Sequence, residues 1–317
     1  MKINKKLFSF CIITDKKYLV QTLVLLDQLK KYNVYILCAD NYSYRFLNKN
    51  YINDFKILKT NIIEKFFNLK KIKYNRSYIE YIFTLKSFFI KWIFLKIKKN
   101  SYVIYLDSDI FFFSKPELLI KETYYNSVCL TPHRFSKSNY HLNIYGKFNA
   151  GFISFKNDKV GSSALNWWAK SCKKECSLKN LKNYTDQKYL EYLYANFSKI
   201  KKINNIGFNL APWNLDSYKI SLNDNNQIFI NKKKLVFFHF HGFKNIFGCI
   251  YSHSLKNYNV KNNKELLNYI YKSYLNILNN KLQFFKGLKS FYYTYNLKEL
   301  IKNFIKSNLI INFKFNL

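Results

Sequence analysis

Two aspartates stand one residue apart at the end of an apolar stretch, YVIYLDSDIFFF (102–113). Burying ionised carboxylates without partners is very costly, and two like charges this close repel each other. A divalent cation between Asp107, Asp109 and an anionic ligand would remove that repulsion, and Mg²⁺ and Mn²⁺ accept such oxygen ligands. The pair therefore predicts a metal–diphosphate site, or else two turn acids at a strand end without a metal.

A second polar cluster ends the apolar run LVFFHFHGFK (235–244). A neutral imidazole, here from His239 or His241, can complete the coordination of a first-row metal. Gly242 permits close backbone approach, and Lys244 can balance the charge of a diphosphate. Two histidines in a strand also occur for structural reasons, so the metal interpretation depends on pairing this cluster with the two aspartates.

Strands and helices must alternate to position these clusters. The pattern predicts helices over 18–31, 80–98, 157–176 and 185–197, the last with Thr185 as its N-cap. Strands are expected over 7–14, 34–40, 55–60, 101–107, 127–133, 148–155 and 235–243. Such alternation predicts an α/β fold with a mostly parallel sheet, in which ligands bind at the carboxyl ends of the strands.

Length and composition indicate one large α/β domain over residues 1–255 and an extension over 256–317. The extension is basic, aromatic and helix-like, which is typical of a segment that lies on an anionic membrane surface, here through residues 261–317. A helical cap on the core is the alternative interpretation.

The formal net charge is +35, which indicates either an anionic partner or the codon bias of an A/T-rich genome. The chain has only three arginines, Arg45, Arg76 and Arg134, which counts against specific recognition of nucleic acid.

Six cysteines occur without a CxxC pair, and Cys172 and Cys176 are four apart, which is not zinc-finger spacing. A reduced, cytoplasmic protein fits best. The N-terminal segment lacks the pattern of a signal peptide, and no long uncharged apolar stretch predicts a membrane span.

Five motifs occur in the order known from one enzyme family: ITDKKYL (13–19), YLDSDIFF (105–112), FNAGFISF (148–155), TDQKYL (185–190) and HFHGFK (239–244). In these the chain resembles the GT-A fold nucleotide-sugar glycosyltransferases, in particular the family 8 galactosyl- and glucosyltransferases. It is also similar to bacterial glycosyltransferases of surface-polysaccharide clusters, through LTPHRFS (130–136), Trp167–Trp168 and GFNLAPWN (207–214). The resemblance covers roughly residues 7 to 250.

The resemblance implies a GT-A (Rossmann-like) fold and a role for each matching residue. Asp107, Asp109 and His239 would hold Mn²⁺ or Mg²⁺, and Asp186 and Gln187 would lie beside the donor sugar. Asp186 would orient a sugar hydroxyl or act as a base, or it is simply a helix-cap acid. Thr14, Asp15 and Tyr18 would contact the base and ribose of the donor, and Asn149 would contact its sugar. Gly242 would permit close approach of the backbone, and Lys244 would contact the diphosphate.

The chain departs from the family pattern at two points. Asn245 and Ile246 stand where family 8 has Pro-Trp after its lysine, and the family's arginine upstream of the two aspartates has no clear counterpart. Lys86 and Lys91 are both candidates for that position. His133 and Trp213 would line the acceptor cleft, although Trp213 suits a core position equally well.

The activity implied is transfer of a hexose from a nucleotide-diphosphate sugar, with a UDP-sugar favoured, to a cell-envelope glycan or lipid-linked acceptor. A non-enzymatic basic protein that binds membranes or nucleic acid is the alternative of another class. A haloacid-dehalogenase-like phosphatase also uses paired aspartates after an apolar strand, but Phe111 stands where that family prefers Thr or Val.

Overall fold

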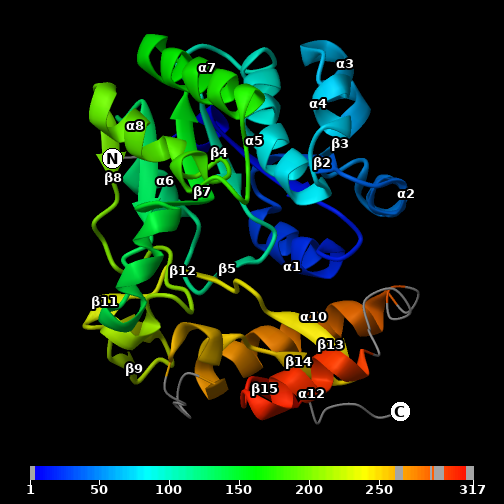
Figure 1. The fold of residues 1–317 in the computed structure, drawn as a ribbon, viewed down its shortest axis with the longest axis vertical. Helices are drawn as coiled ribbons and strands as arrows, with labels where there is room; N and C mark the ends of the chain where they lie inside the picture. The colour runs from blue at the N-terminus through cyan, green and yellow to red at the C-terminus, as the bar shows by residue number, and fades with distance from the viewer. Residues whose placement is uncertain (1–3, 261–266, 286–287, 289–295, 312–317) are drawn as a thin grey trace.

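A seven-stranded mixed sheet forms the centre of the computed structural model, which describes residues 4–260, 267–285, 288 and 296–311 (Figure 1). All neighbouring strands are parallel except β7, which is antiparallel to both of its neighbours. The α/β class and the mostly parallel sheet expected from the sequence are therefore confirmed. In spatial order the strands are β3 (Lys56–Lys59), β2 (Asn33–Cys38), β1 (Phe8–Thr14), β4 (Tyr102–Leu106), β7 (Phe148–Lys156), β6 (Val128–Pro132) and β8 (Ile200–Lys202).

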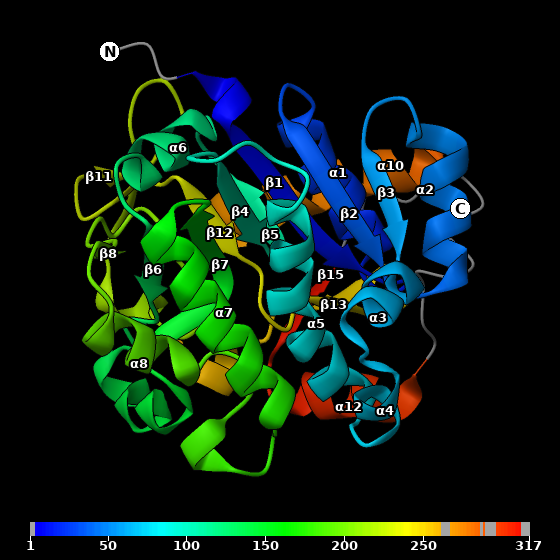
Figure 2. The ribbon, with the colours of Figure 1, turned by 90° about the horizontal axis from the view of Figure 1, so that it is seen from above.

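Both faces of this sheet are buried. Successive side chains of a strand point to opposite faces, so one strand can contribute to both hydrophobic clusters. Along β1, Phe8, Phe10 and Ile12 join one hydrophobic cluster, whereas Cys11 and Ile13 join the other. Helices α5 and α7 cover the second face and lie on the near side of the central strands in Figure 2. The α-helices that accompany the large sheet are α1 (Leu19–Leu29), α2 (Asn41–Tyr51), α3 (Thr60–Phe67), α4 (Lys70–Tyr74), α5 (Tyr78–Phe94), α6 (Glu117–Thr123), α7 (Lys159–Lys174) and α8 (Tyr189–Asn196).

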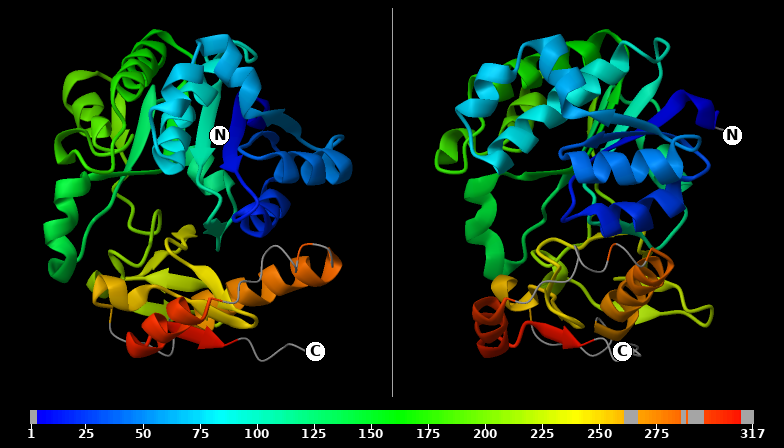
Figure 3. Two further views of the ribbon diagram at one scale, coloured as in Figure 1. Left: turned by 45° about the vertical axis from the view of Figure 1, so that its right-hand side comes forward. Right: turned by 90° about the vertical axis from the view of Figure 1, so that its right-hand side faces the viewer.

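The later part of the chain forms, together with β5, a second layer, which lies below the large sheet in Figure 3. Three small antiparallel sheets build it: β5 (Ile110–Phe112) with β12 (Phe237–His239); β9 (Ile220–Leu222), β10 (Ile228–Ile230) and β11 (Lys233–Lys234); and β13 (Lys244–Phe247), β14 (Ile250–Ser252) and β15 (Leu309–Ile311). The α-helices of this layer are α10 (Ser273–Phe284) and α12 (Leu297–Ile305). The short 3₁₀ segments are η1 (Lys5–Leu7), η2 (Lys137–Tyr145), η3 (Leu181–Asn183), η4 (Leu215–Ser217) and η5 (Leu255–Tyr258), and η6 (Leu267–Lys272) is a π-helical turn.

One predicted helix start is wrong. Helix α8 begins at Tyr189 with Lys188 at its N-cap, so Thr185 does not cap it. Thr185 instead has a positive φ of 52°, and the chain turns there. The turn buries Asp186, whose backbone oxygen accepts a hydrogen bond from Trp168 Nε1 at 2.8 Å. Tertiary contacts to Asp186 therefore replace the local capping interaction.

The C-terminal segment is helical in α10 and α12, as predicted, and it also adds strand β15. Helix α10 packs on α1, where Lys281 forms an ion pair with Asp27, and the ring of Tyr274 stacks on Phe240 at 3.9 Å between centroids. This packing fits a cap on the core, and the boundary at residue 255 stays a prediction. Among the described residues, every helix is too short or too polar to cross a lipid bilayer.

Candidate functional site

The two aspartates lie in the tight connection between β4 and β5. The backbone N–H of Ile110 donates to the carbonyl of Asp107 at 3.2 Å, which closes the turn. Between the aspartates, Ser108 Oγ donates to the carbonyl of Ile13 at 2.8 Å. That hydrogen bond fixes the turn beside the carboxyl end of β1, which ends at Thr14 and is followed by Asp15. Strands β1 and β4 thus deliver their terminal residues to one place, as parallel neighbours in such a sheet do.

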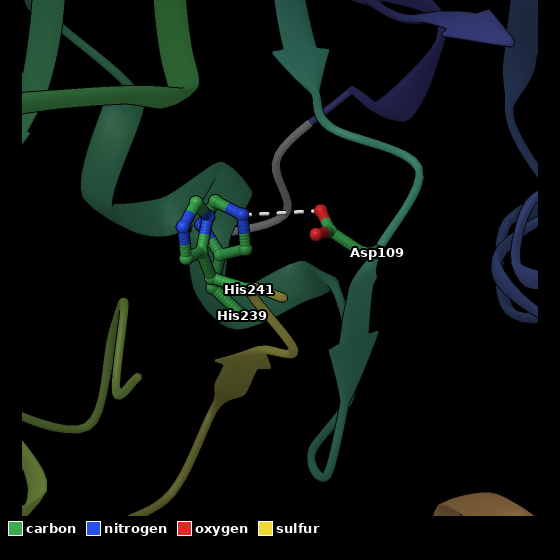
Figure 4. Close-up of side chains that lie close together, drawn as sticks. All are labelled: Asp109, His239 and His241. Carbon is green, nitrogen blue, oxygen red and sulfur yellow. Dashed lines mark ion pairs between the residues drawn. The ribbon is translucent and has the colours of Figure 1, made fainter. Parts of the chain in front are cut away.

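His239 reaches this turn because β12 pairs with β5. His239 lies opposite Ile110 in the register, and the N–H of Phe240 donates to the carbonyl of Asp109 at 2.8 Å. Nε2 of His239 lies 3.1 Å from Asp109 Oδ1, the contact drawn in Figure 4. One possible ligand atom from each of Asp109, His239 and His241 lies within 4.8 Å of the other two.

The charges of Asp109 and His239 stabilise each other. Burial by itself raises the pKa of Asp109, but His239, together with His241 and a backbone hydrogen bond, lowers it, and the pKa lies below its ordinary value. Burial lowers the pKa of His239, whereas Asp109 raises it, and the net shift is upward. A divalent cation bound at Asp109 would take the place of the proton on His239, so its binding would release a proton.

The other nitrogen of His239 is oriented by Asn149. Nδ1 of His239 lies 3.3 Å from Asn149 Oδ1, and Asn149 Nδ2 lies 3.3 Å from His133 Nε2. A proton on Nδ1 directed at Asn149 leaves Nε2 free to bind a metal, which is the usual arrangement around metal-ligating histidines. Together with carboxylate oxygens, this imidazole forms a mixed oxygen and nitrogen donor set that fits Mn²⁺.

Gly151 leaves room for the His239 ring. A Cβ atom built on Gly151 would lie 2.5 Å from Cε1 of His239 and 2.8 Å from Oδ1 of Asn149. The glycine of the FNAG motif is therefore required by the close approach of β7 to this imidazole. The sequence motif alone did not assign Gly151 this role.

Asp107 lies at the centre of a wider charge network. Its Oδ1 accepts a hydrogen bond from the Tyr105 hydroxyl at 2.8 Å and lies 3.5 Å from Lys86 Nζ, and its Oδ2 lies 4.0 Å from His239 Nε2. Lys86 Nζ also lies 3.0 Å from Asp186 Oδ2 and donates to the Ala150 carbonyl at 2.9 Å.

Lys86 and Asp186 are each only 2% exposed, so this ion pair is buried. Burial lowers the pKa of Lys86, but Asp107 and Asp186 raise it, and the net shift is upward. Burial raises the pKa of Asp186, which Lys86 partly offsets. The structure thus distinguishes the two candidate lysines, because Lys91 lies over the rings of Phe67 and Phe88 instead.

A helical pattern could have identified Lys86 before the structure was known. It lies on the same helical face as Ile90 and Ile93, which are fully buried, and a lysine is rarely buried unless it is paired. The family resemblance assigned His241 no role, because the family motif uses only the first histidine, yet the two histidines are neighbours in space.

The residues expected at the nucleotide lie around the end of β1. Asp15 accepts a hydrogen bond from the Tyr78 hydroxyl at 2.9 Å, and Thr14 Oγ1 lies 2.6 Å from Thr22 Oγ1. Partial burial and the nearby carboxylates of Asp109, Asp15 and Asp107 raise the pKa of the Tyr18 hydroxyl.

Three other expected residues have protein partners. Lys244 forms an ion pair with Glu299 at 2.9 Å and is half exposed. Gly242 has a φ of +73°, a conformation that favours glycine, and its carbonyl accepts from Ser254 Oγ at 2.7 Å. Gln187 Nε2 donates to the carbonyl of Tyr145 at 2.9 Å.

Trp213 is a buried residue that packs against the histidines. Its ring centroid lies 5.2 Å from that of His239 and 5.4 Å from that of His241, and its Nε1 donates to the carbonyl of His133 at 2.9 Å. Burial lowers the pKa of His133 to about 3, so its imidazole is neutral. Trp213 is therefore part of the wall that holds the histidines in place.

Comparison with known proteins identifies relatives without an assigned activity. The chain is 30% identical over 244 residues to "Uncharacterized protein YfnD" of Bacillus subtilis (strain 168), covering 74% of this chain and 78% of YfnD. It is 28% identical over 250 residues to "Uncharacterized protein YfnF" of the same organism, covering 74% of this chain and 82% of YfnF. No protein-family model matches the chain.

Two solved glycosyltransferase structures are similar at low TM-scores. The apo-form glycosyltransferase GlyE of Streptococcus pneumoniae TIGR4 gives a TM-score of 0.39 at 18% identity, covering 63% of this chain and 46% of GlyE, so the match spans less than half of GlyE. A glycosyltransferase involved in the glycosylation of the major capsid of PBCV-1 gives 0.43 at 10% identity, covering 74% of this chain and 93% of that chain. Likenesses this weak establish neither an activity nor a ligand for this chain.

Replacing Lys86 by Met is expected to destabilise the protein by about 3 kcal/mol, because it leaves the Asp186 carboxylate buried without its cation. The free energy of unfolding is measured by urea denaturation. The deficit should shrink as the pH falls, since protonation of Asp186 removes the uncompensated charge. The matched variant Lys91→Met should change stability much less, and equal losses in the two variants would contradict the assignment of Lys86 to the buried pair.

Replacing Gly151 by Ala is expected to displace the His239 ring, because the new methyl group overlaps it. We expect a loss of about 1 to 3 kcal/mol in stability and weaker Mn²⁺ binding by calorimetric titration. Ser154→Ala, a buried change on the same strand, serves as the control. If Gly151→Ala binds Mn²⁺ as tightly as the unaltered chain, His239 does not contribute to a metal site.

Proposed function

We propose that this chain, which belongs to the same family as the protein YfnD of Bacillus subtilis, is a metal-dependent GT-A glycosyltransferase. Its donor would be a nucleotide-diphosphate sugar, with a UDP-sugar favoured, and the group transferred would be a hexose. Its acceptor would be a hydroxyl of a cell-envelope glycan or of a lipid-linked glycan. The observation that carries the proposal is the meeting of Asp109 and His239, from distant parts of the sequence, at the carboxyl end of β4.

Asp107, Asp109 and His239 would hold Mn²⁺ or Mg²⁺, with His241 close enough to take part. When bound, the cation would neutralise the negative charge that develops on the departing nucleoside diphosphate. Asn149 would keep the Nε2 atom of His239 directed at the cation by accepting a hydrogen bond from its Nδ1.

Asp186 would orient a hydroxyl of the donor sugar. Its side chain is almost fully buried, and Lys86 holds its carboxylate in an ion pair, which favours a fixed position over proton abstraction. Lys86 also lies 3.5 Å from Asp107, so it links the sugar-orienting acid to the metal-binding acid. Gln187, the next residue, would contact the same sugar.

The end of β1 would bind the nucleoside. Thr14, Asp15 and Tyr18 would contact the base and ribose, and the Tyr78 hydroxyl, which donates a hydrogen bond to Asp15, would hold that carboxylate in place. Gly242 would allow the diphosphate to approach the backbone. Lys244 would have to exchange its present partner, Glu299, for the diphosphate.

Thermal stabilisation by nucleotides tests the proposal directly. UDP, GDP, CDP and CMP are compared, each with and without Mn²⁺. We expect one diphosphate to raise the unfolding midpoint only with the metal, by an amount that corresponds to about 2.7 kcal/mol at a hundredfold excess over its dissociation constant.

Asp109→Asn and His239→Ala should abolish that stabilisation, because each removes a metal ligand. Asp216→Asn and His141→Ala change exposed residues of the same types outside the cluster and should leave it intact. The proposal fails if no nucleotide stabilises the folded protein under any metal condition, or if the two pairs of variants behave alike.

A further inference from the structure

Helix α12 presents its apolar side chains to solvent. Leu297 is 61% exposed, Ile301 52%, Phe304 73% and Ile305 76%. At the angular step of an α-helix, these positions fall within an arc of about 100°. Four large apolar side chains therefore form one continuous stripe, which we call the α12 stripe. All three views place α12 at the end of the molecule opposite α7 (Figures 1 and 3).

The opposite face of the helix is polar and points inward, the reverse of an ordinary surface helix. Asn303 is only 4% exposed, and its Oδ1 accepts a hydrogen bond from Ser252 Oγ of β14 at 2.8 Å. Glu299 pairs with Lys244 of β13. Rotating the helix to bury the stripe would break both contacts, so the stripe is held outward by polar interactions.

Lysines border the stripe on one side. Lys298 and Lys302 follow Leu297 and Ile301 in the sequence, Lys306 follows Ile305, and all three are exposed. A second copy of this chain would bring the same positive charges face to face, at a net charge of +35 for each copy. An anionic lipid surface is attracted by those lysines and accepts the apolar side chains below its headgroups.

We propose that α12 is an interfacial helix that binds anionic bilayers through Leu297, Ile301, Phe304 and Ile305, with Lys298 and Lys302 at the headgroups. The purpose of this contact rests on the proposed function, because α12 would hold the enzyme where a lipid-linked acceptor is found. The packing of α12 on β13, with the hydrogen bond from Ser252 to Asn303, places the bound helix beside the strand that follows the histidine cluster.

Vesicle flotation tests the inference without any enzymatic readout. The full chain is mixed with vesicles of phosphatidylcholine alone or of phosphatidylcholine with phosphatidylglycerol. We expect binding to the anionic vesicles, lowered about tenfold or more by the triple variant Ile301→Ser/Phe304→Ser/Ile305→Ser. Lys298→Gln/Lys302→Gln should weaken binding less, and mainly at low salt.

The matched control is Ile62→Ser/Phe66→Ser, which also removes exposed apolar side chains, but from helix α3. Ile62 is 41% exposed and Phe66 is 59% exposed. It should bind vesicles like the unaltered chain. Equal binding by the triple variant and the unaltered chain would overturn the inference. A complete lack of vesicle binding by the unaltered chain would also overturn it. In that case, dissociation of a dimer by the triple variant in light scattering would show that the stripe joins two copies of the chain instead.

Nucleotide stabilisation of the triple variant separates this inference from the proposed function. A variant that no longer floats but still responds to a nucleotide with Mn²⁺ supports both. A chain that floats through α12 but responds to no nucleotide keeps the membrane helix and loses the transferase.

Discussion

The contact between Asp109 and His239 is the interaction on which the rest of the site depends. It joins the turn after β4 to the end of β12. The backbone hydrogen bond from the N–H of Phe240 to the carbonyl of Asp109 keeps the two side chains next to each other. Each nearby feature serves that contact. Gly151 makes room for the ring, Asn149 fixes its orientation, and Trp213 packs against it.

The site is also limited by its balance of charge. Three carboxylates, those of Asp107, Asp109 and Asp186, are gathered around Lys86 and His239. A buried ion pair usually contributes little to net stability, because desolvation offsets the attraction. Such a costly arrangement inside a core is more readily explained by function than by stability, since perturbed groups tend to gather at active sites.

Local patterns predicted the parts of the fold that depend on local order. The apolar run before Asp107 predicted both β4 and the position of the acids, because parallel strands deliver their ends to one edge. The start of α8 was missed, because a buried contact to Asp186 overrides the capping preference of Thr185. The helical pattern of α5 favours Lys86 over Lys91 only weakly, because the helix is apolar on most sides. The tertiary contacts that decide between the two lysines come from β7 and from the turn at Asp186, and only the structure shows them.

The anchoring of Lys86 has a consequence for how the site meets a ligand. Its ammonium group is held by a backbone carbonyl and two carboxylates within a packed core, so its position is set when the chain folds. A charged ligand entering such a site finds dipoles already aligned and causes little reorganisation of the protein around it. Selectivity would then come from how well the ligand matches a rigid electrostatic template, and tight binding would not require the protein to close around it.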